Sequence, residues 1–522
     1  MLGAIGHVAR LFHAGWVLAR EGVFADVDPS LLPASARLPL RAAKLIARKG
    51  ADAQAHRLSR AMSRLGPSYV KLGQFLATRP DVVGAAAALE LEQLQDRVPP
   101  FPKAVAIATL EAAFGAKLET IFTRFGDPIA AASIAQVHRA TALTPEGEKD
   151  VAVKILRPGV ERRFKRDLGD MFFAARVAER YFPEARRLRM IDVVDTLARS
   201  VKMEMDFRLE AAAASEFAEN TKDDNDFRVP TVDWDRTAKD VLTIEWIDGV
   251  TLSDMSGLAR AGHDLPDLGR LVIQSFLRHA MRDGFFHADM HQGNLFIDHS
   301  GRLVAVDFGI MGRLGPKERR FLAEILYGFI TRNYRRVAEV HFEAGYVPAV
   351  HRVDDFAQAI RAIGEPIHSR TADQISMAKL LSLLFEITAL FDMRTRTELV
   401  MLQKTMVVVE GVARSLNPRL DMWSTAEPVV AEWIAEKLGP VGIAQDVGRG
   451  LSNLARLAAQ LPDALERSER LLRHLDSGDD KGVHLSAESI QRLGRLQARQ
   501  SRGGVYALWA IATLLAAMLW IG

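Results

Sequence analysis

One stretch in the middle of the chain constrains its fold more than any other. Residues 287–309 read His-Ala-Asp-Met-His-Gln-Gly-Asn, then Leu-Phe-Ile-Asp-His-Ser-Gly-Arg-Leu-Val-Ala-Val, then Asp-Phe-Gly. The apolar runs 295–297 and 303–306 lie on either side of a Ser-Gly turn signal and therefore predict a β-hairpin. Upstream, apolar residues recur at helical spacing between 268 and 280, and Gly284 is a typical helix stop. The predicted order is helix, loop, hairpin and Asp-Phe-Gly.

Three polar side chains in this stretch have the order and spacing of a phosphoryl-transfer centre. Asp289 precedes Asn294 by five positions, and Asp307 begins the Asp-Phe-Gly. Protein kinases place a catalytic Asp, an Asn and a metal-binding Asp in this order, because a polyphosphate and its magnesium need oxygen ligands around the attacking group. We therefore assign Asp289 to catalysis, and Asn294 and Asp307 to Mg²⁺. Common loop residues flanking a hairpin would explain any one of these residues, but not the ordered set.

The two histidines of the same stretch allow another interpretation. His287 and His291 are four residues apart, as metal-binding histidines can be. The residues between them are Ala-Asp-Met, whereas a zinc protease has a Glu-x-x arrangement. We therefore favour phosphoryl transfer over a zinc site.

The composition is that of ordinary globular protein, in a chain long enough for two or three units. Of the 522 residues, 48% are hydrophobic and 25% are charged. Basic and acidic residues number 68 and 65, so there is no basic field that would indicate a nucleic-acid partner. The chain has no cysteine, which excludes disulfides, thiolate metal sites and a cysteine nucleophile.

The C-terminal end of the chain differs from the rest. Residues 504–522 carry no charge and approach the ~20 residues that a helix needs to span a bilayer. Trp509 and Trp520 lie near the two ends of this segment, and arginines between 492 and 502 favour a cytoplasmic position for the large domain. We predict a C-terminal transmembrane helix; the alternative is a buried terminal helix of a soluble protein.

The N-terminal residues predict an amphipathic surface helix. Residues 1–20 combine apolar residues at helical spacing with Arg10 and Arg20, and no acidic residue precedes Glu21. The segment lacks the uninterrupted apolar core of a secretory signal. It also lacks serine, which disfavours a mitochondrial presequence.

A nucleotide site requires phosphate-binding groups upstream of the loop. Lys154 lies in the β-rich run Val-Ala-Val-Lys-Ile-Leu and would hold the α and β phosphates. The glycine-rich loop that precedes this strand in ordinary kinases is missing, and alanines stand in residues 128–140 instead. A Walker Gly-Lys pair is also absent, and Gly448-Arg-Gly450 lacks the third glycine of a dinucleotide fingerprint. Phosphate must therefore be held in another way.

These motifs together resemble the UbiB family of atypical kinase-like proteins, which is linked to ubiquinone biosynthesis. The match includes an alanine-rich loop at 130–136, Lys-x-Gly-Gln at 71–74, Glu-x-Asp at 204–206 and the His-Ala-Asp loop with Asp-Phe-Gly. It runs from about residue 60 to about residue 320. The resemblance is specific, because neither the Lys-x-Gly-Gln segment nor the alanine loop is a general kinase feature.

The resemblance implies roles for residues outside the loop. Lys71 would reach from the N-terminal extension into the cleft, interact with Glu204 and Asp206, and cover the space where a protein substrate would dock. Asp206 and Glu210 lie four residues apart, which predicts one face of a helical stretch, and Glu210 would pair with Lys154.

The resulting assignments add further residues to Asp289, Asn294 and Asp307. Residues 245–249 resemble the hinge whose backbone meets adenine. To catalysis we also assign Lys71, Glu204 and Asp206. To ATP binding we assign Ala131, Ala132, Ser133, Ile134, Ala135, Gln136, Lys154, Glu210, Glu245 and Ile247.

The sequence also departs from the family pattern. The family often has proline where this chain has Met290 and Gln292. No Ala-Pro-Glu segment follows Gly309, and in kinases that region helps to dock peptide substrates. The second departure argues against protein phosphorylation.

We expect an α+β fold of the atypical protein-kinase-like type. It would have two lobes, a helical N-terminal extension, a helical C-terminal region and a C-terminal transmembrane helix. The predicted domains are the extension with Lys-x-Gly-Gln at 1–127, the N-lobe at 128–248, the C-lobe at 249–425, the helical C-terminal region at 426–503 and the transmembrane anchor at 504–522.

The resemblance implies a magnesium-dependent ATPase in which Asp289 orients a nucleophile, which we expect to be water. It further implies support of prenylated quinone biosynthesis by extracting or presenting lipid intermediates. Expected partners are ATP, Mg²⁺, membrane lipid and prenylated quinone intermediates, and quinone-biosynthesis enzymes, and a homodimer is allowed. The expected location is the inner (plasma) membrane of a bacterium, with the catalytic domain on the cytoplasmic face; the mitochondrial inner membrane is the alternative.

Three other functional classes remain open. A kinase would transfer the phosphoryl group to a protein or small molecule. A non-catalytic scaffold would bind nucleotide only as a conformational ligand. Relatives have also been labelled 2-polyprenylphenol 6-hydroxylases, but oxygenation needs a flavin or a metal–oxygen site, and the sequence has no dinucleotide fingerprint.

Overall fold

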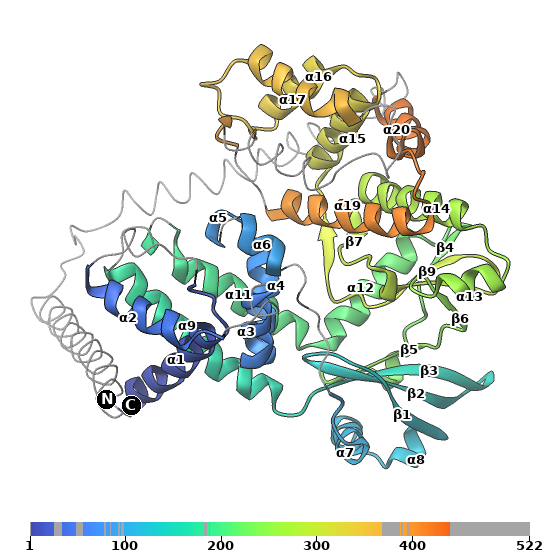
Figure 1. Cartoon of the computed structure of the whole chain (residues 1–522). Helices are drawn as coiled ribbons and strands as arrows, with labels where there is room; N and C mark the ends of the chain where they lie inside the picture. Colours follow the sequence, from blue (N-terminus) through green and yellow to red (C-terminus); the bar gives the residue numbers. More distant parts are fainter. Residues whose placement is uncertain are drawn as a thin grey trace, which may run out of the picture. The chain divides into compact units, whose positions relative to one another are not determined.

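The residues of the chain form two compact units. Unit 1 contains the described residues up to Leu209 together with Asp233–Glu245, and unit 2 contains Glu210–Val232 and the described residues from Trp246 onward. Figure 1 shows the computed structural model, which describes residues 2–25, 34–48, 56–77, 80–83, 85–91, 94, 99–181, 185–186, 188–367, 387, 390–393 and 397–438.

Unit 1 begins with the helices of the N-terminal extension. A small apolar core of Met62, Ala77, Leu91 and Leu94 holds part of this region together. The helices are α1 (Leu2–Arg20), α2 (Ala34–Ile46), α3 (Arg57–Leu65), α4 (Pro67–Ala77), α5 (Pro80–Val83), α6 (Ala85–Leu91), α7 (Lys103–Phe114) and α8 (Leu118–Ile121).

A mixed helix and sheet region follows in unit 1. The antiparallel sheet has the order β1-β2-β3-β5, and α7 packs against it over a core that contains Leu110, Val153 and Ile155. β3 alternates buried and partly exposed residues, as expected for a half-covered sheet. The strands are β1 (Arg124–Ala131), β2 (Ala135–Thr144), β3 (Gly147–Leu156) and β5 (Val241–Glu245).

Long helices complete unit 1. They are α9 (Val160–Tyr181), α11 (Met190–Glu204) and the first turn of α12 (Phe207–Asn220), which continues into unit 2. The predicted N-terminal helix is confirmed as α1 and lies on α9, where Arg10 donates from Nε and Nη2 to the buried carboxylate of Asp170 at 2.6 and 2.7 Å. Trp16 of α1 is exposed. A buried carboxylate requires such a partner, so this pair fixes how α1 lies on α9.

Unit 2 contains the predicted helix and hairpin, and both predictions are confirmed. The helix α14 (Leu265–Arg278) continues into a π-helical turn, His279–Asp283, and Gly284 ends it with a φ of 65°. The hairpin consists of β8 (Leu295–Asp298) and β9 (Leu303–Ala305), which pair antiparallel. The sheet order is β4-β9-β8-β6, with β4 (Phe227–Arg228) and β6 (Gly249–Thr251) at the edges.

Helices surround these strands within unit 2. A separate two-stranded ribbon joins β7 (Phe285–His287) to β10 (Met311–Arg313). The remaining described helices are α13 (Met255–Arg260), α15 (Pro316–Ile330), α16 (Tyr334–Glu343), α17 (Val353–Ile367), α19 (Thr397–Leu416) and α20 (Met422–Leu438).

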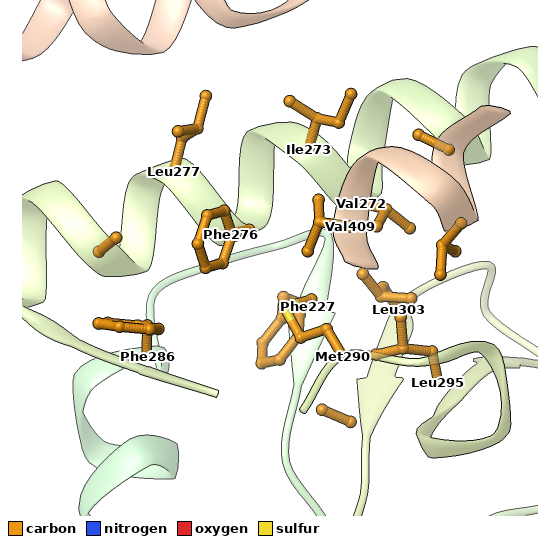
Figure 2. Close-up of a cluster of buried hydrophobic side chains, with 14 of the residues drawn as sticks. Phe227, Val272, Ile273, Phe276, Leu277, Phe286, Met290, Leu295, Leu303 and Val409 are labelled. Carbon is orange, nitrogen blue, oxygen red and sulfur yellow. The ribbon is translucent and has the colours of Figure 1, made fainter. Parts of the chain in front are cut away.

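The main core of unit 2 joins the helices to the strands that carry the loop. Figure 2 shows Phe276 and Val272 from α14, Val409 from α19 and Leu295 and Leu303 from the hairpin in one apolar cluster. Each of these side chains is fully buried or nearly so, and burial of one contributes about 1.5–3 kcal/mol. The hairpin ends are therefore held by the helices, and not by their own short strand pairing.

The membrane prediction falls on residues 504–522, which lie outside the described residues. Within the described ranges, no helix has both the length and the hydropathy needed to cross a bilayer.

Candidate active site

His287 organises the start of the predicted catalytic loop. Its buried imidazole donates from Nε2 to the main-chain oxygen of Val306 at 3.0 Å, and its Nδ1 accepts from the main-chain nitrogen of Asp289 at 3.1 Å. Burial lowers the pKa of His287, and the neutral ring is the form that can both donate and accept. His287 thereby connects the backbone of Asp289 to the residue before Asp307. From the sequence, His287 was considered only as part of an alternative zinc site.

Asn294 lies beside Asp289, as the five-residue spacing predicted. Its side-chain Nδ2 donates to the main-chain oxygen of Asp289 at 3.0 Å, and its main-chain oxygen accepts from the nitrogen of Val306 at 2.9 Å. Because Nδ2 is used in this hydrogen bond, the amide presents Oδ1 as its acceptor on the other side. The short 3-10 turn Gln292–Asn294 therefore places a neutral oxygen ligand between the loop and the hairpin.

Asp307 adopts a backbone conformation that few residues with a side chain adopt. Its φ is 64°, in the left-handed region, which costs of order 1–3 kcal/mol. Phe308 is buried and anchors the segment: its ring lies 5.5 Å from that of His287 and 5.9 Å from that of Phe217 on α12. The packing of Phe308 thus holds the Asp307 carboxylate in place.

A second carboxylate lies near Asp307 within unit 2. A methyl group added at Gly309 would lie 3.3 Å from Oδ1 of Asp307 and 3.8 Å from Oε2 of Glu210. Glu210 is buried on α12, whose Phe217 packs against Phe308. The structure therefore brings Glu210 to the Asp-Phe-Gly turn. Its predicted partner Lys154 belongs to unit 1, and that pairing stays a prediction.

The oxygen donors of unit 2 suit magnesium bound together with a nucleotide. Asp307 offers a carboxylate and Asn294 an amide oxygen, the hard ligands that Mg²⁺ prefers. Among the described residues, no cluster of three or more carboxylate and histidine side chains could hold a metal ion by itself. Magnesium commonly completes its coordination with substrate phosphates and water, so the residues present fit this ion.

Asp289 and His291 lie on the more open side of the loop. Their side chains are 41% and 52% exposed, and Nε2 of His291 lies 3.9 Å from Oδ2 of Asp289. A carboxylate that is accessible to solvent and fixed by its backbone can accept a proton from an attacking hydroxyl or water. This geometry agrees with the role assigned to Asp289.

In unit 1, the alanine-rich stretch forms the turn between β1 and β2. Ala131 pairs with Gln136, and the nitrogen of Ala132 donates to the oxygen of Ala135 at 2.8 Å. The hairpin turn that links β1 to β2 therefore consists of the residues predicted to bind ATP, which are Ala131, Ala132, Ser133, Ile134, Ala135 and Gln136.

Two side chains hold this turn in place. The Gln136 amide accepts from the nitrogen of Phe101 at 2.8 Å and donates to its oxygen at 3.3 Å. Arg157 donates from Nη2 to the oxygens of Ala132 and Pro99 at 3.1 Å. Arg157 was not singled out from the sequence, where an arginine next to a strand carries no signal. The role of Gln136 in ATP binding stays a prediction.

The lysines predicted for the site both have defined surroundings in unit 1. Lys71 on α4 lies with Nζ 3.0 Å from Oε2 and 3.1 Å from Oε1 of Glu204 at the end of α11. These two side chains are only 13% and 14% exposed. Lys154 on β3 lies with Nζ 5.4 Å from the ring centre of Phe207. The expected contact of Lys71 with Glu204 is therefore present, while its contact with Asp206 and the roles in catalysis and ATP binding stay predictions.

Asp206 differs from expectation in its local structure. α11 ends at Glu204 and α12 begins at Phe207, so Asp206 lies between two helices and does not share a helix face with Glu210. Its carboxylate accepts from the nitrogen of Arg208 at 3.2 Å, as an N-cap does. Hydrogen bonds from the Arg208 guanidinium hold the pKa of Asp206 below its usual value. Aspartate favours helix starts, which explains the break.

The hinge-like residues lie where the chain passes from unit 1 to unit 2. Glu245 ends β5 in unit 1, and Trp246 is the first residue of unit 2. Ile247 is buried, and Gly249 begins β6. A methyl group at Gly249 would lie 2.4 Å from the main-chain oxygen of Ile297, so glycine is required there for β6 to pair with β8.

Comparisons with known proteins agree with this geometry. The family model described as ABC1 atypical kinase-like domain matches residues 93–341, and the model described as UbiB helical domain matches residues 360–421. The first range contains the alanine-rich turn, Lys154 and the catalytic loop. The second contains the whole of α19.

The chain is also similar to curated proteins over most of its length. A protein of Marinobacter nauticus named "Probable protein kinase UbiB" is 38% identical over 510 residues, which cover 96% of this chain and 92% of that protein. A protein of the same name from Pseudomonas putida is 39% identical over 470 residues, 88% of this chain and 86% of that protein. The solved structure titled "The complex structure of Rv3197-erythromycin from Mycobacterium tuberculosis" is 26% identical, with a TM-score of 0.46, and covers 69% of this chain and 90% of that one.

Proposed function

The chain belongs to the UbiB family of atypical kinase-like proteins, and from this premise we propose that it binds ATP with Mg²⁺ and hydrolyses it in support of ubiquinone biosynthesis. The observation that carries the proposal is the convergence of Asp289, Asn294 and the Asp307 segment through His287 and Val306 in unit 2. Side chains that are merely loop residues would not need this set of hydrogen bonds.

Each residue has a role that its surroundings support. Asn294 and Asp307 would hold Mg²⁺, which neutralises charge on the phosphates when bound. Asp289 orients water and accepts its proton, since its carboxylate is accessible and its backbone is fixed at both the nitrogen and the oxygen. Lys154 is assigned to the α and β phosphates. The alanine-rich turn is assigned to the nucleotide, with Arg157 and Gln136 holding its shape.

We further propose that the protein acts at a membrane on prenylated quinone intermediates and the enzymes that modify them. The uncharged segment 504–522 and the arginines before it support an anchored protein whose large domain faces the cytoplasm of a bacterium. The names of the relatives support the link to ubiquinone. The pathway assignment predicts that loss of the gene lowers quinone and accumulates an early prenylphenol precursor; normal quinone levels would remove it.

A second candidate function is phosphoryl transfer to a protein or small molecule, which the name of the relatives favours. We place hydrolysis first, because no Ala-Pro-Glu segment follows Gly309 to dock a peptide. Incubation of membranes with the protein and ATP labelled at the γ-phosphate separates the two. Label in free phosphate supports hydrolysis, and label on a cell component identifies a kinase.

Substitution of the metal ligand tests the nucleotide site itself. The variant Asp307→Asn keeps the size and polarity of the side chain and removes its charge. Titration of ADP into the full chain with and without Mg²⁺ should show that magnesium strengthens binding to the wild type and no longer does so in the variant. Equal magnesium dependence in both proteins would reject the assignment of Asp307.

A further inference from the structure

Buried and partly exposed residues alternate along the catalytic loop. Asp289 and His291 are partly exposed, whereas Ala288 and Met290 between and before them are buried, with 7% and 1% of their surface exposed. This alternation runs from residue 288 to residue 291, around a turn in which the nitrogen of His291 donates to the oxygen of Asp289. The surroundings of the buried residues, Ala288 and Met290, therefore show which part of the protein supports the loop.

The loop rests on α19, which Figure 1 shows beside α14 in unit 2. The hydroxyl of Thr405, which is completely buried, lies 3.1 Å from the main-chain oxygen of Ala288 and 2.8 Å from that of Met401 one turn earlier. A helix-interior threonine normally bonds only to the carbonyl one turn earlier. Here its single proton is shared with the oxygen of a residue 117 positions away.

Two further contacts extend along the same helix. Met290 lies in the apolar cluster that contains Val409, one turn after Thr405 (Figure 2). At the end of α19, Ser415 accepts from Nε2 of Gln292 at 2.6 Å and donates to the oxygen of Val412. Ala288 and Gln292 thus each form a hydrogen bond with α19, at Thr405 and at Ser415, and Met290 lies in the apolar cluster to which α19 contributes.

The contact at Ala288 acts directly on Asp289. The oxygen of Ala288 and the nitrogen of Asp289 belong to one planar peptide group. Thr405 holds the oxygen, and Nδ1 of His287 accepts from the nitrogen at 3.1 Å. Because both ends of a rigid plane are held, the orientation of the peptide group that leads into Asp289 is fixed.

Ordinary kinase loops have arginine where this chain has Ala288. A methyl group cannot make the polar contacts of an arginine, so the loop needs another support. Gln292, at a position where related sequences often have proline, supplies a hydrogen bond to Ser415. Gln292 therefore adds a side-chain contact between the loop and α19 to the main-chain contact at Ala288.

We propose that α19 positions the catalytic loop, with Thr405 as the main positioning residue for Asp289 and Ser415 as a second contact. This inference rests on the proposed function of Asp289. All of α19 lies within residues 360–421, so the segment matched as the UbiB helical domain is part of the catalytic apparatus and not an appended module.

The test uses the full chain and matched variants. Thr405→Val removes the hydroxyl and keeps the volume, and Thr405→Ser restores the hydroxyl. Thr425→Val is the control, since Thr425 is a buried threonine in α20 whose hydroxyl donates to the oxygen of Asp421 at 2.7 Å and does not reach the loop. Ser415→Ala tests the second contact.

Turnover and backbone exchange are measured for each variant. Thr405→Val should lower kcat for phosphate release about tenfold with KM for ATP within about twofold, because positioning affects the chemical step more than binding. Thr405→Ser should return kcat to near the wild-type value. Hydrogen exchange of a peptide that covers residues 286–296 should be faster in Thr405→Val than in the wild type, and unchanged in Thr425→Val. Ser415→Ala should have a smaller effect of the same kind.

The outcomes separate this inference from the proposed function. Equal kcat and equal exchange in Thr405→Val and wild type would overturn the positioning role, as would a loss that Thr405→Ser does not restore. If the wild-type protein releases no phosphate, the ATPase proposal falls and exchange alone decides. If exchange of the loop is then faster in Thr405→Val and in no control variant, α19 positions the loop. Unchanged exchange would reject that role.

Discussion

Lys71 and Glu204 form an ion pair, with Nζ 3.0 Å from Oε2, although 133 positions separate them in the chain. Both side chains are largely removed from water, so each charge is stabilised by the other. This pair connects α4 of the N-terminal extension to α11. It is the contact by which the extension and the Glu-x-Asp motif form one structure.

The Lys71–Glu204 pair should contribute measurably to stability. Glu204→Gln removes the charged carboxylate from a largely buried ion pair and should lower the free energy of unfolding by about 2 kcal/mol. Glu219→Gln is the control, because its pair with Lys222 is exposed and should be worth less than about 1 kcal/mol. Urea denaturation of both variants measures the difference. Equal losses would mean that the Lys71 pair behaves as a surface pair.

Asp289 should be needed for turnover and not for binding. Asp289→Asn keeps the main-chain bonds to His287 and Asn294 and removes the proton acceptor. Phosphate release should fall about 100-fold, while calorimetry with Mg²⁺ and ADP shows little change. A fully active variant would instead favour the non-catalytic scaffold, in which nucleotide acts only as a conformational ligand.

The left-handed backbone of Asp307 makes an unusual prediction about glycine. Glycine normally destabilises relative to alanine, but at a φ of 64° it avoids the steric cost of a Cβ. Asp307→Gly should therefore be more stable than Asp307→Ala by about 1 kcal/mol, although neither should bind nucleotide in a magnesium-dependent manner. Thermal unfolding compares the two variants. If the alanine variant were the more stable, the backbone strain would be refuted.

The glycines of unit 2 should respond in opposite directions to alanine substitution. Gly249→Ala places a methyl group 2.4 Å from the backbone oxygen of Ile297 and should cost about 2 kcal/mol or more. Gly411→Ala in α19 meets nothing within 4 Å and should stabilise by about 0.5–1 kcal/mol, because alanine favours the helix. Urea denaturation gives both signs, and a neutral Gly249→Ala would indicate that β6 and β8 can move apart.

Asp298 should give a defined dependence of stability on pH. Burial alone would raise its pKa, but hydrogen bonds from Ser300 and Arg228 outweigh burial and lower the pKa to about 2. In the unfolded chain this carboxyl has its ordinary pKa of 3.8, so its contribution to stability is complete above pH ~4 and is lost as the pH falls towards 2. The stability difference between wild type and Asp298→Asn should therefore shrink over that window. A constant difference would show that the charge of Asp298 is not involved.

Local patterns in the chain were sufficient to predict much of the site. The hairpin that carries Asp307 and the helix that Gly284 ends follow from periodicity and turn residues within a short stretch. The five-residue spacing of Asp289 and Asn294 was also sufficient, because a short 3-10 turn closes it. These features depend on interactions between near neighbours.

Local sequence patterns predicted the wrong local structure for Asp206 and did not predict several residues that hold the site in place. Asp206 was predicted on a helix face, but its own side chain caps the next helix and separates it from α11. Arg157 and Thr405 are ordinary residues in their segments, and nothing near them in sequence indicates that they bond to Ala132 and Ala288. Their partners lie 25 and 117 positions away.

The chemistry of the site could therefore be predicted from the sequence alone, because short turns are enough to bring oxygen ligands at set intervals together. The precision of the site was decided by folding. The planar group between Ala288 and Asp289 is held by a histidine one residue before it and by a threonine far along the chain. Contacts between distant segments form only when apolar burial brings helices such as α14 and α19 together, and that burial depends on the whole unit.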